Sequence, residues 1–388
     1  MVSTQGEQKV HFNPGPQTIF KLSTLSQYLP RMIAMILSNP GESLTLVDGF
    51  AGNGKAGIHP GSTRIMLEAA ERWTQSKNGD PQRIQIIAVE KDRARYNDLL
   101  NLKNEFPNII FTALNDTIEN HLQRIVESIK KGLFVFLDPY GLQIPFNVIT
   151  SAFSSRFSNN AHPTELLLNV SSQGLLRTAG SLEQLRNKSS KLSKMLGPSN
   201  WKDICDSNLS GDLLAKKLTE CYINSLQSHT GFRDSLIYPV KRTNNIFVET
   251  AVYRLALLSA RPQYSFLPFY DSLTRARPDW IKEIDEAEAQ ERRQAPLVPL
   301  DEVEPLSIDF LKAQVRNNIC ALMNEHKTFC LKDYKTYFKV LGACGFGRIG
   351  FKEINQILKS MEQDNVIFCE KKTSTERYKW IWSCTGNN

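Results

Sequence analysis

The feature that most constrains the fold is an apolar run that ends in an acid and opens directly into a glycine-spaced turn. It lies at residues 45–55 and reads TLVDGFAGNGK. An apolar run of this length is typical of a buried parallel strand, and glycine allows the backbone to leave such a strand sharply. Ser62 is then expected to cap a helix. A strand, a glycine turn and a helix at the edge of a parallel sheet form a site for nucleotide-like cofactors.

The composition is that of a soluble globular protein with room for a second domain. The chain has 388 residues, of which 41% are hydrophobic and 22% are charged. No apolar stretch is long enough to span a membrane, and the N-terminus lacks the apolar core of a signal peptide, so we expect no membrane partner. The seven cysteines contain no C-x-x-C pair, which favours a reducing, cytoplasmic location. The formal charge of +7 permits a nucleic-acid partner without establishing one.

Strand-like and helix-like segments alternate over most of the chain. Strands are expected near residues 45–48, 84–90, 109–111, 133–138 and 164–170. This alternation predicts an α/β, Rossmann-like fold with a mostly parallel sheet and helices on both faces. Two later strands, at 236–240 and 247–258, are expected to close the sheet as an antiparallel hairpin at its edge.

A change of composition divides the chain into three parts. Residues 1–278 are predicted to form the Rossmann-like domain, and residues 279–304 a charged helix with a Pro-containing linker. Residues 305–388 are predicted to form a small α+β winged helix-turn-helix domain, because helical segments precede a hairpin with a basic tip. Its phosphate contacts would come from four basic residues of that hairpin: Lys371, Lys372, Arg377 and Lys379.

Four acids follow expected strand ends, namely Asp48, Glu90, Asp116 and Asp138. Ligands of an open α/β sheet bind at the carboxyl ends of its strands, so these acids are expected to meet in one crevice. Any one of them is as well explained by capping the following helix. One functional crevice accounts for the whole series.

The glycine turn fits neither the dinucleotide fingerprint nor the phosphate-binding loop. It resembles the first motif of S-adenosylmethionine-dependent methyltransferases, and residues 50–54 are close to the F-x-G-x-G form common among nucleobase amino-methyltransferases. The resemblance implies S-adenosyl-L-methionine as the cofactor. Asp48 would accept a hydrogen bond from its ammonium group, Glu90 would bind its ribose hydroxyls, and Asp116, or Asn115 beside it, its adenine amine. The turn itself would be shaped around the cofactor by Gly49, Phe50, Ala51, Gly52 and Gly54.

A second motif, FLDPYG at residues 136–141, resembles the D-P-P-Y signature of amino-methyltransferases. In those enzymes the acid and a proline carbonyl orient an exocyclic amine toward the methyl group, and the aromatic ring stacks on the extruded base. The resemblance implies Asp138, Pro139 and Tyr140 as catalytic residues. With one proline instead of two, the motif is more similar to that of tRNA guanine dimethyltransferases. Alternatively, the segment after Asp138 is only a turn whose tyrosine covers the sheet.

Taken together, the chain resembles the three-Cys-motif partner proteins (TcmP) over roughly residues 15–275. The resemblance implies a bacterial protein with a methyltransferase-like Rossmann core and a three-Cys-motif protein as partner. Residues 20–29 resemble the helix that covers the methionine end of the cofactor in circularly arranged nucleobase methyltransferases, which implies that Lys21 pairs with the cofactor carboxylate, although a solvated helix lysine explains it at least as well. Gln17 stands where many members have a histidine, so no role of that histidine is carried over. The matching residues are Lys21 with Tyr28-Leu29, 48–54, Gly61-Ser62, Glu90 and 138–141.

The leading hypothesis is therefore a methyltransferase acting on an exocyclic amine of a nucleobase in DNA or RNA, in a bacterial defence or mobile-element system. One alternative is a degenerate methyltransferase-fold scaffold that works in a complex with a three-Cys-motif protein. Another is a regulator that binds nucleic acid through the wing. No metal is expected, because His59 and His162 lack a metal-binding constellation.

Overall fold

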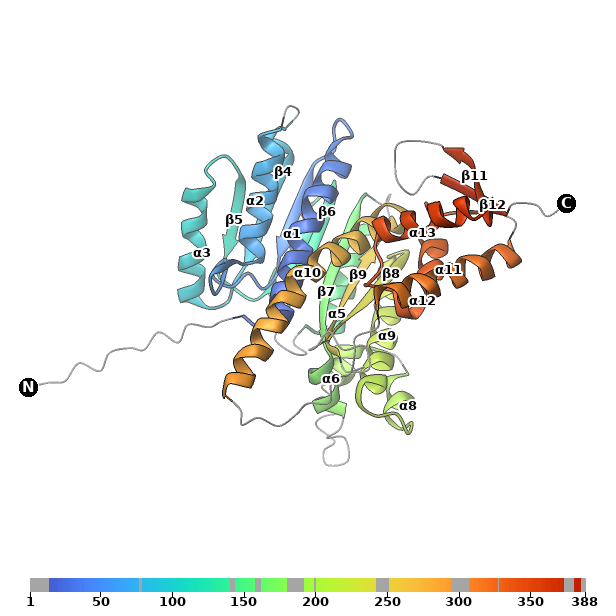
Figure 1. Cartoon of the computed structure of the whole chain (residues 1–388). Helices are drawn as coiled ribbons and strands as arrows, with labels where there is room; N and C mark the ends of the chain where they lie inside the picture. The colour runs from blue at the N-terminus through green and yellow to red at the C-terminus, as the bar shows by residue number, and fades with distance from the viewer. Residues whose placement is uncertain are drawn as a thin grey trace, which may run out of the picture.

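A seven-stranded sheet with the order β5-β4-β1-β6-β7-β9-β8 forms the centre of the molecule (Figure 1). The computed structural model describes residues 14–76, 79–139, 144–157, 162–179, 192–198, 200–241, 251–294, 307–326, 328–372 and 380–384. The strands are β1 (Leu44–Asp48), β4 (Ile84–Val89), β5 (Ile110–Leu114), β6 (Gly132–Leu137), β7 (Thr164–Ser171), β8 (Asp234–Lys241) and β9 (Ala251–Ser259).

The order of the strands reverses direction at β1. The chain runs from β1 outward through β4 to β5, and then returns to the other side of β1 for β6 and β7, all in parallel. Such a reversal is the topological switch point of a doubly wound sheet. The prediction of an α/β, Rossmann-like fold is confirmed. The antiparallel pair at the edge is confirmed as well, with β9 lying between β7 and β8.

Burial on both faces explains why the central strands are continuous apolar runs. Every residue of β1 and of β6 is buried. Helices α1, α2 and α10 supply the apolar cluster on one face, and α4, α5 and α9 that on the other. No helix of the described residues is long and apolar enough to cross a membrane. The helices around the sheet are α1 (Pro16–Leu37), α2 (Ser62–Thr74), α3 (Arg93–Glu105), α4 (Leu122–Ser128), α5 (Phe146–Ser154), α6 (Ser172–Ala179), α8 (Trp201–Cys205), α9 (Gly211–Thr230) and α10 (Pro262–Gln294), with short 3-10 turns η1 (Pro81–Arg83), η2 (Ile118–Asn120) and η3 (Ser155–Phe157).

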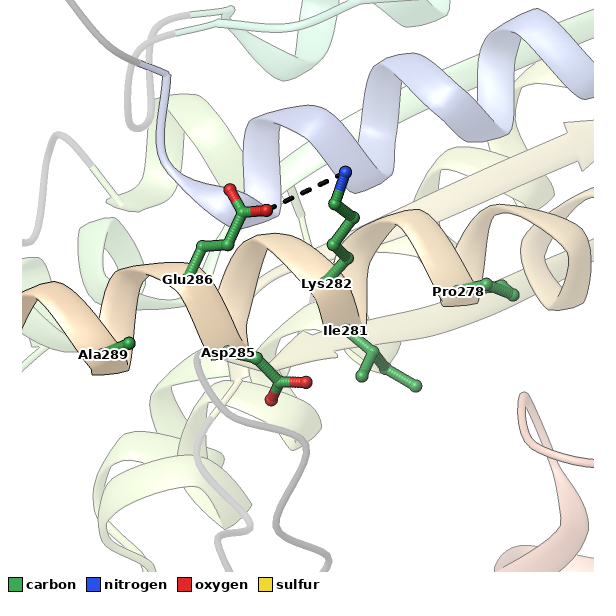
Figure 2. A pocket seen from close by; sticks show the side chains of 6 residues that line it. All are labelled: Pro278, Ile281, Lys282, Asp285, Glu286 and Ala289. Atoms are coloured by element: carbon green, nitrogen blue, oxygen red, sulfur yellow. Dashed lines mark ion pairs between the residues drawn. The ribbon is translucent and has the colours of Figure 1, made fainter.

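Helix α10 runs alongside α1 and continues beyond it (Figure 1). The predicted boundary at residue 278 falls inside this helix, so the division into domains stays a prediction. Past Pro278 the helix borders a shallow hollow, and an exposed ion pair joins Lys282 and Glu286 at 3.8 Å (Figure 2). An exposed pair of this kind contributes little to stability.

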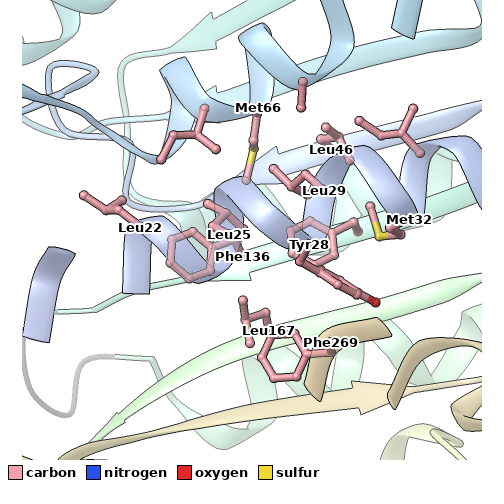
Figure 3. Close-up of a cluster of buried hydrophobic side chains, with 14 of the residues drawn as sticks. Leu22, Leu25, Tyr28, Leu29, Met32, Leu46, Met66, Phe136, Leu167 and Phe269 are labelled. Atoms are coloured by element: carbon pink, nitrogen blue, oxygen red, sulfur yellow. The ribbon is translucent and has the colours of Figure 1, made fainter. Parts of the chain in front are cut away.

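Helix α1 is anchored through a stripe of apolar residues at helical spacing. Leu25, Leu29 and Met32 are fully buried between the sheet and its neighbouring helices, where Figure 3 shows them beside Phe136 and Phe269. Burying one such side chain contributes about 1.5–3 kcal/mol. The packing therefore fixes α1 against β6, the strand that leads to Asp138 of the second motif.

A buried polar network crosses this apolar layer. The Tyr28 hydroxyl donates to Oε2 of Glu165 at 2.6 Å, and the Ser265 hydroxyl donates to Oε1 at 2.5 Å. The hydroxyls of Ser265 and Ser259 lie 2.7 Å apart. Burial raises the pKa of Glu165 above its ordinary value. The network ties α1 to β7, β9 and α10 through a carboxyl group that has no access to water.

The last part of the chain adds a three-stranded antiparallel sheet with the order β10-β12-β11. The elements follow in the order helix, strand, helix, helix and hairpin, so the expected helices and hairpin are present, while the winged-helix identity stays a prediction. Their bounds are α11 (Ile308–Glu325), β10 (Thr328–Cys330), α12 (Tyr334–Gly345), α13 (Phe351–Gln363), β11 (Ile367–Lys372) and β12 (Trp380–Cys384).

This last part packs directly on α10 and on the edge of the central sheet. The fully buried Tyr270 of α10 donates its hydroxyl to the Ile349 carbonyl at 2.8 Å and accepts from the Gly347 N–H at 2.9 Å. The Tyr334 hydroxyl donates to Asp234 Oδ2 at 2.5 Å. Helix α10 therefore contributes to the apolar core of both parts.

We predict opposite effects for two Tyr→Phe substitutions at fully buried tyrosines. Tyr28→Phe should lower the free energy of unfolding by about 1–3 kcal/mol, because Glu165 loses a buried hydrogen bond. Tyr337→Phe is the matched control, since the Tyr337 hydroxyl is buried with no hydrogen-bond partner among the described residues, and its removal should be neutral or stabilising. Urea unfolding of both variants measures the difference, and equal losses would show that the network adds nothing.

Candidate functional site

The glycine turn continues from β1 at the switch point of the sheet. The Gly49 N–H donates to the Phe136 carbonyl at 2.9 Å, and the Ala51 N–H donates to the Val89 carbonyl at 3.1 Å. The turn is thereby tied to both neighbouring strands. Gly52 and Gly54 have φ angles of +61° and +75°, a region that favours glycine.

A small hairpin, β2 (Lys55–Ala56) and β3 (His59–Pro60), closes the turn before α2 begins. The Gly61 N–H donates to the Gly54 carbonyl at 2.9 Å, and a Cβ on Gly61 would lie 2.7 Å from the Gly54 carbonyl carbon. The predicted cap at Ser62 is wrong, because Gly61 is the N-cap of α2 and Ser62 already belongs to its first turn. The Ser62 hydroxyl bonds to Asp48 instead.

Asp48 is completely buried at the end of β1. Its Oδ2 accepts from the Thr63 hydroxyl at 2.7 Å, and its Oδ1 accepts from the Phe50 N–H at 3.3 Å. Burial raises the pKa of Asp48 from 3.8 to about 6, although hydrogen bonds from Ser62 and Thr63 oppose the rise. The nearby Asp138 raises this pKa further. The two acids are therefore close enough to interact electrostatically, and the crevice predicted for all four acids stays a prediction.

Glu90 connects the glycine turn to the loop before α3. Its Oε2 accepts from the Gly52 N–H, and its Oε1 accepts from the Asp92 N–H, both at 2.8 Å. A carboxylate oxygen has two lone pairs, so each oxygen retains capacity for a second donor. Glu90 is thus held rigidly beside the turn and is able to accept from a hydroxyl group.

Asn115 and Asp116 differ in how closely they join this site. The Asn115 amide donates to the Glu90 carbonyl at 2.9 Å and therefore lies against the end of β4. Asp116 accepts from the Thr117 N–H at 2.7 Å and faces the His121 ring at 2.9 Å. These bonds, with one from the Asn120 amide, lower the pKa of Asp116. The carboxylate of Asp116 binds residues of the loop that follows it, whereas Asn115 contacts the Glu90 backbone directly.

Asp138 lies at the end of β6 and has a different partner on each oxygen. Its Oδ2 forms an ion pair with the ammonium group of Lys21 from α1, and its Oδ1 accepts from the Asn169 amide of β7 at 2.6 Å. Lys21 is 8% exposed, and its Nζ lies 5.6 Å from the ring centroid of Tyr253 on β9. The Tyr253 hydroxyl donates to the Gln17 carbonyl of α1. Side chains of α1 and β7 thus bind this carboxylate, and Tyr253 of β9 lies beside its lysine partner.

Some of the predicted residues lie outside the described residues. Pro139, directly after Asp138, is buried. Tyr140, Arg377 and Lys379 lie outside the described residues. Lys371 and Lys372 are on strand β11.

Sequence reasoning missed two contacts of the site. Thr63 donates to Asp48, and the ring of Tyr253 lies beside Lys21. The only local signal for Thr63 was a hydroxyl pair at the start of α2. Tyr253 is 232 positions beyond Lys21 in the chain, and no pattern along the sequence links the two.

Two hollows bordered by the described residues lie elsewhere. One borders α10 (Figure 2), and a second lies between the start of α5 and α8. Neither is lined by Asp48, Glu90 or Asp138. Within the described part of the chain, no three His, Cys, Asp or Glu side chains are grouped so that they could hold a metal ion. The candidate site consists of the glycine turn and the acids that follow the strand ends.

Comparison with known proteins gives structural similarity only. No family model matches the chain, and no curated protein matches it in sequence. A Legionella pneumophila protein of the DUF519 family is 14% identical, with a TM-score of 0.39, over 71% of this chain and 92% of its own. The plantazolicin methyltransferase BamL, solved with SAH, is 11% identical, with a TM-score of 0.32 over 63% of this chain and 84% of its own. An O-methyltransferase from Bacillus cereus, also with SAH, is 12% identical, with a TM-score of 0.33 over 61% and 80%. Similarity at this level identifies neither a family nor an activity.

The raised pKa of Asp48 predicts a stability that falls as pH rises. Between pH 3.8 and about 6 the folded state binds the Asp48 proton more tightly than the unfolded state, so deprotonation costs up to about 3 kcal/mol across this window. In Asp48→Asn this contribution should be absent, and the variant should lose less stability than the wild type over the same window. Urea unfolding at a series of pH values measures the difference between the two proteins.

Asp116→Asn is the matched control for this experiment. Hydrogen bonds lower the pKa of Asp116, so its contribution grows as pH rises and has the opposite sign. Parallel pH profiles for the wild type and Asp48→Asn would contradict the assignment of a raised pKa to Asp48.

Proposed function

We propose that this protein is an S-adenosylmethionine-dependent methyltransferase that transfers a methyl group to an exocyclic amine of a nucleobase in DNA or RNA. The observation that carries the proposal is the meeting of Asp48, Glu90 and Asp138 at one edge of the sheet. Asp48 and Glu90 contact the glycine turn, and Asp138 follows the neighbouring strand. Asp138, the proposed acceptor of the target amine, is thus close enough to Asp48, a proposed acceptor of the cofactor, to raise its pKa.

The residues present fit the chemical groups of the cofactor. Asp48 accepts from the ammonium group, Glu90 from the ribose hydroxyls, and Asn115 or Asp116 from the adenine amine. Gly52 leaves room for a ligand, because no atom of the described residues lies within 4 Å of the position that its Cβ would occupy. Gly49, Phe50, Ala51 and Gly54 complete the turn. When bound, the cofactor supplies a methyl group on a positively charged sulfur.

Asp138 and the carbonyl of Pro139 hold the target amine in this proposal. An amine conjugated to an aromatic ring is a poor nucleophile, so two acceptors that orient its nitrogen lower the barrier to attack. Tyr140 stacks on the base, which must leave its helix for its amine to reach Asp138. Asn169 supports this role, because it holds Oδ1 of Asp138 in place.

The last part of the chain is proposed to be a winged helix that brings nucleic acid to the site. Its order of helix, strand, helix, helix and hairpin supports this assignment. Lys371, Lys372, Arg377 and Lys379 supply phosphate contacts that provide affinity rather than sequence choice. A protein with a three-cysteine motif is a further proposed partner, on the resemblance to the TcmP family.

Replacing Asp138 should separate chemistry from cofactor binding. In Asp138→Ala, transfer of tritiated methyl groups to pools of DNA and transfer RNA should fall at least 100-fold, because the amine loses its main acceptor. Binding of S-adenosylhomocysteine, followed by calorimetry, should persist. Asp285→Ala, which removes an exposed carboxylate from α10 (Figure 2), is the control and should leave transfer unchanged. A wild type that binds no S-adenosylhomocysteine at high micromolar concentration would refute the proposed activity.

Neutralising the hairpin lysines should weaken binding to all nucleic acids alike. For Lys371→Ala/Lys372→Ala, the slope of log affinity against log salt on a duplex DNA should be shallower by about 2, because two phosphate contacts are lost. Lys216→Ala/Lys217→Ala removes the same charge from the exposed face of α9 and should leave the slope unchanged. Equal slopes for both variants would place the nucleic-acid contact outside this hairpin.

A further inference from the structure

One buried lysine stands between the two proposed ligands. Lys21 is the residue proposed to pair with the cofactor carboxylate, yet its ammonium group is bound to Oδ2 of Asp138. Asp138 is the residue proposed to accept the target amine. In this state the charges of the lysine and the acid neutralise each other, so each is a weaker partner for its proposed ligand.

The burial of Lys21 strengthens this pairing. The side chains of Lys21 and Asp138 are 9% and 24% exposed. The ammonium group of Lys21 is buried, so it is strongly destabilised once its partner is removed. The ring of Tyr253, 5.6 Å from Lys21 Nζ, offers an attraction that is much weaker than an ion pair. Lys21 therefore leaves Asp138 only when another anion takes the place of the carboxylate.

Asn169 keeps the acid in position during such an exchange. Its amide nitrogen donates to Oδ1 of Asp138 at 2.6 Å, and Lys21 uses only Oδ2. Departure of Lys21 would thus vacate one defined oxygen without releasing the carboxylate from its orientation. That oxygen is the acceptor for one N–H of the incoming amine.

We infer that Lys21 exchanges between Asp138 and the carboxylate of the cofactor, so that cofactor binding vacates Oδ2 of Asp138 for the target amine. This inference rests on the proposed function and adds an order in which the two ligands bind. The cofactor binds first, and the amine binds tightly only afterwards. The coupling is reciprocal, because a bound amine also removes the competitor of the cofactor for Lys21.

The test is calorimetric titration with S-adenosylhomocysteine. Asp138→Asn should bind it about tenfold more tightly than the wild type, since Lys21 no longer has to leave a carboxylate. Lys21→Met should bind it about tenfold more weakly. In the double variant, Lys21→Met/Asp138→Asn, the gain from Asp138→Asn should vanish, because that gain acts through the lysine. The double variant also keeps the site neutral, which guards against misfolding caused by one unpaired charge.

Methylthioadenosine is the control ligand, because it keeps the adenosine and the sulfur but lacks the amino-acid carboxylate. Its affinity should change less than about twofold in all three variants. Equal or weaker binding of S-adenosylhomocysteine to Asp138→Asn, with binding by the wild type intact, would overturn the exchange and leave the proposed function standing. No binding by the wild type would refute the proposed function itself.

Discussion

The burial of β1 between two parallel strands is the constraint on which the rest of the structure depends. β1 pairs with β4 on one side and β6 on the other, and all five of its residues are buried. Its backbone N–H and C=O groups are therefore hydrogen-bonded to strands on both sides, and the chain leaves the sheet at the carboxyl ends of the parallel strands. Because β4 and β6 end at the same edge, Glu90 and Asp138 meet the glycine turn there. The position of the site follows from this pairing.

Helix α1 carries a second constraint, because it places two polar side chains on one face. Lys21 and Tyr28 are two helical turns apart, which puts both toward the sheet. Tyr28 bonds to Glu165 of β7, and Lys21 bonds to Asp138 after β6. Each contact satisfies a carboxyl group that would be costly to leave unpaired in the interior. The apolar stripe supplies the packing energy of α1, and these two bonds specify its register.

The acids at the strand ends show how far sequence reasoning reached. Asp48, Glu90 and Asp138 were predicted to share one crevice. Parallel strands that are buried on both faces appear in the sequence as apolar runs, and each of these runs is followed by an acid. The structure places these three at the carboxyl ends of the adjacent strands β4, β1 and β6, and the shared crevice stays a prediction. Asp116 illustrates the limit, since its carboxylate serves the local turn at Thr117 and His121. An acid that follows a strand is compatible with binding a ligand or with capping its own turn, and only the neighbouring side chains distinguish these two roles.

The sequence by itself determined the parallel α/β architecture, the turn at Asp48 and the edge at which the site lies. These features are local, because burial, chain direction and glycine conformation each leave a pattern within a few residues. The tertiary structure decided that β9 inserts between β7 and β8, that Gly61 rather than Ser62 precedes α2, and that Lys21 pairs with Asp138. That last partner is 117 positions away along the chain. Contacts between segments so far apart depend on how the helices pack, and an apolar stripe shows which face of a helix is buried but not which distant residue it meets.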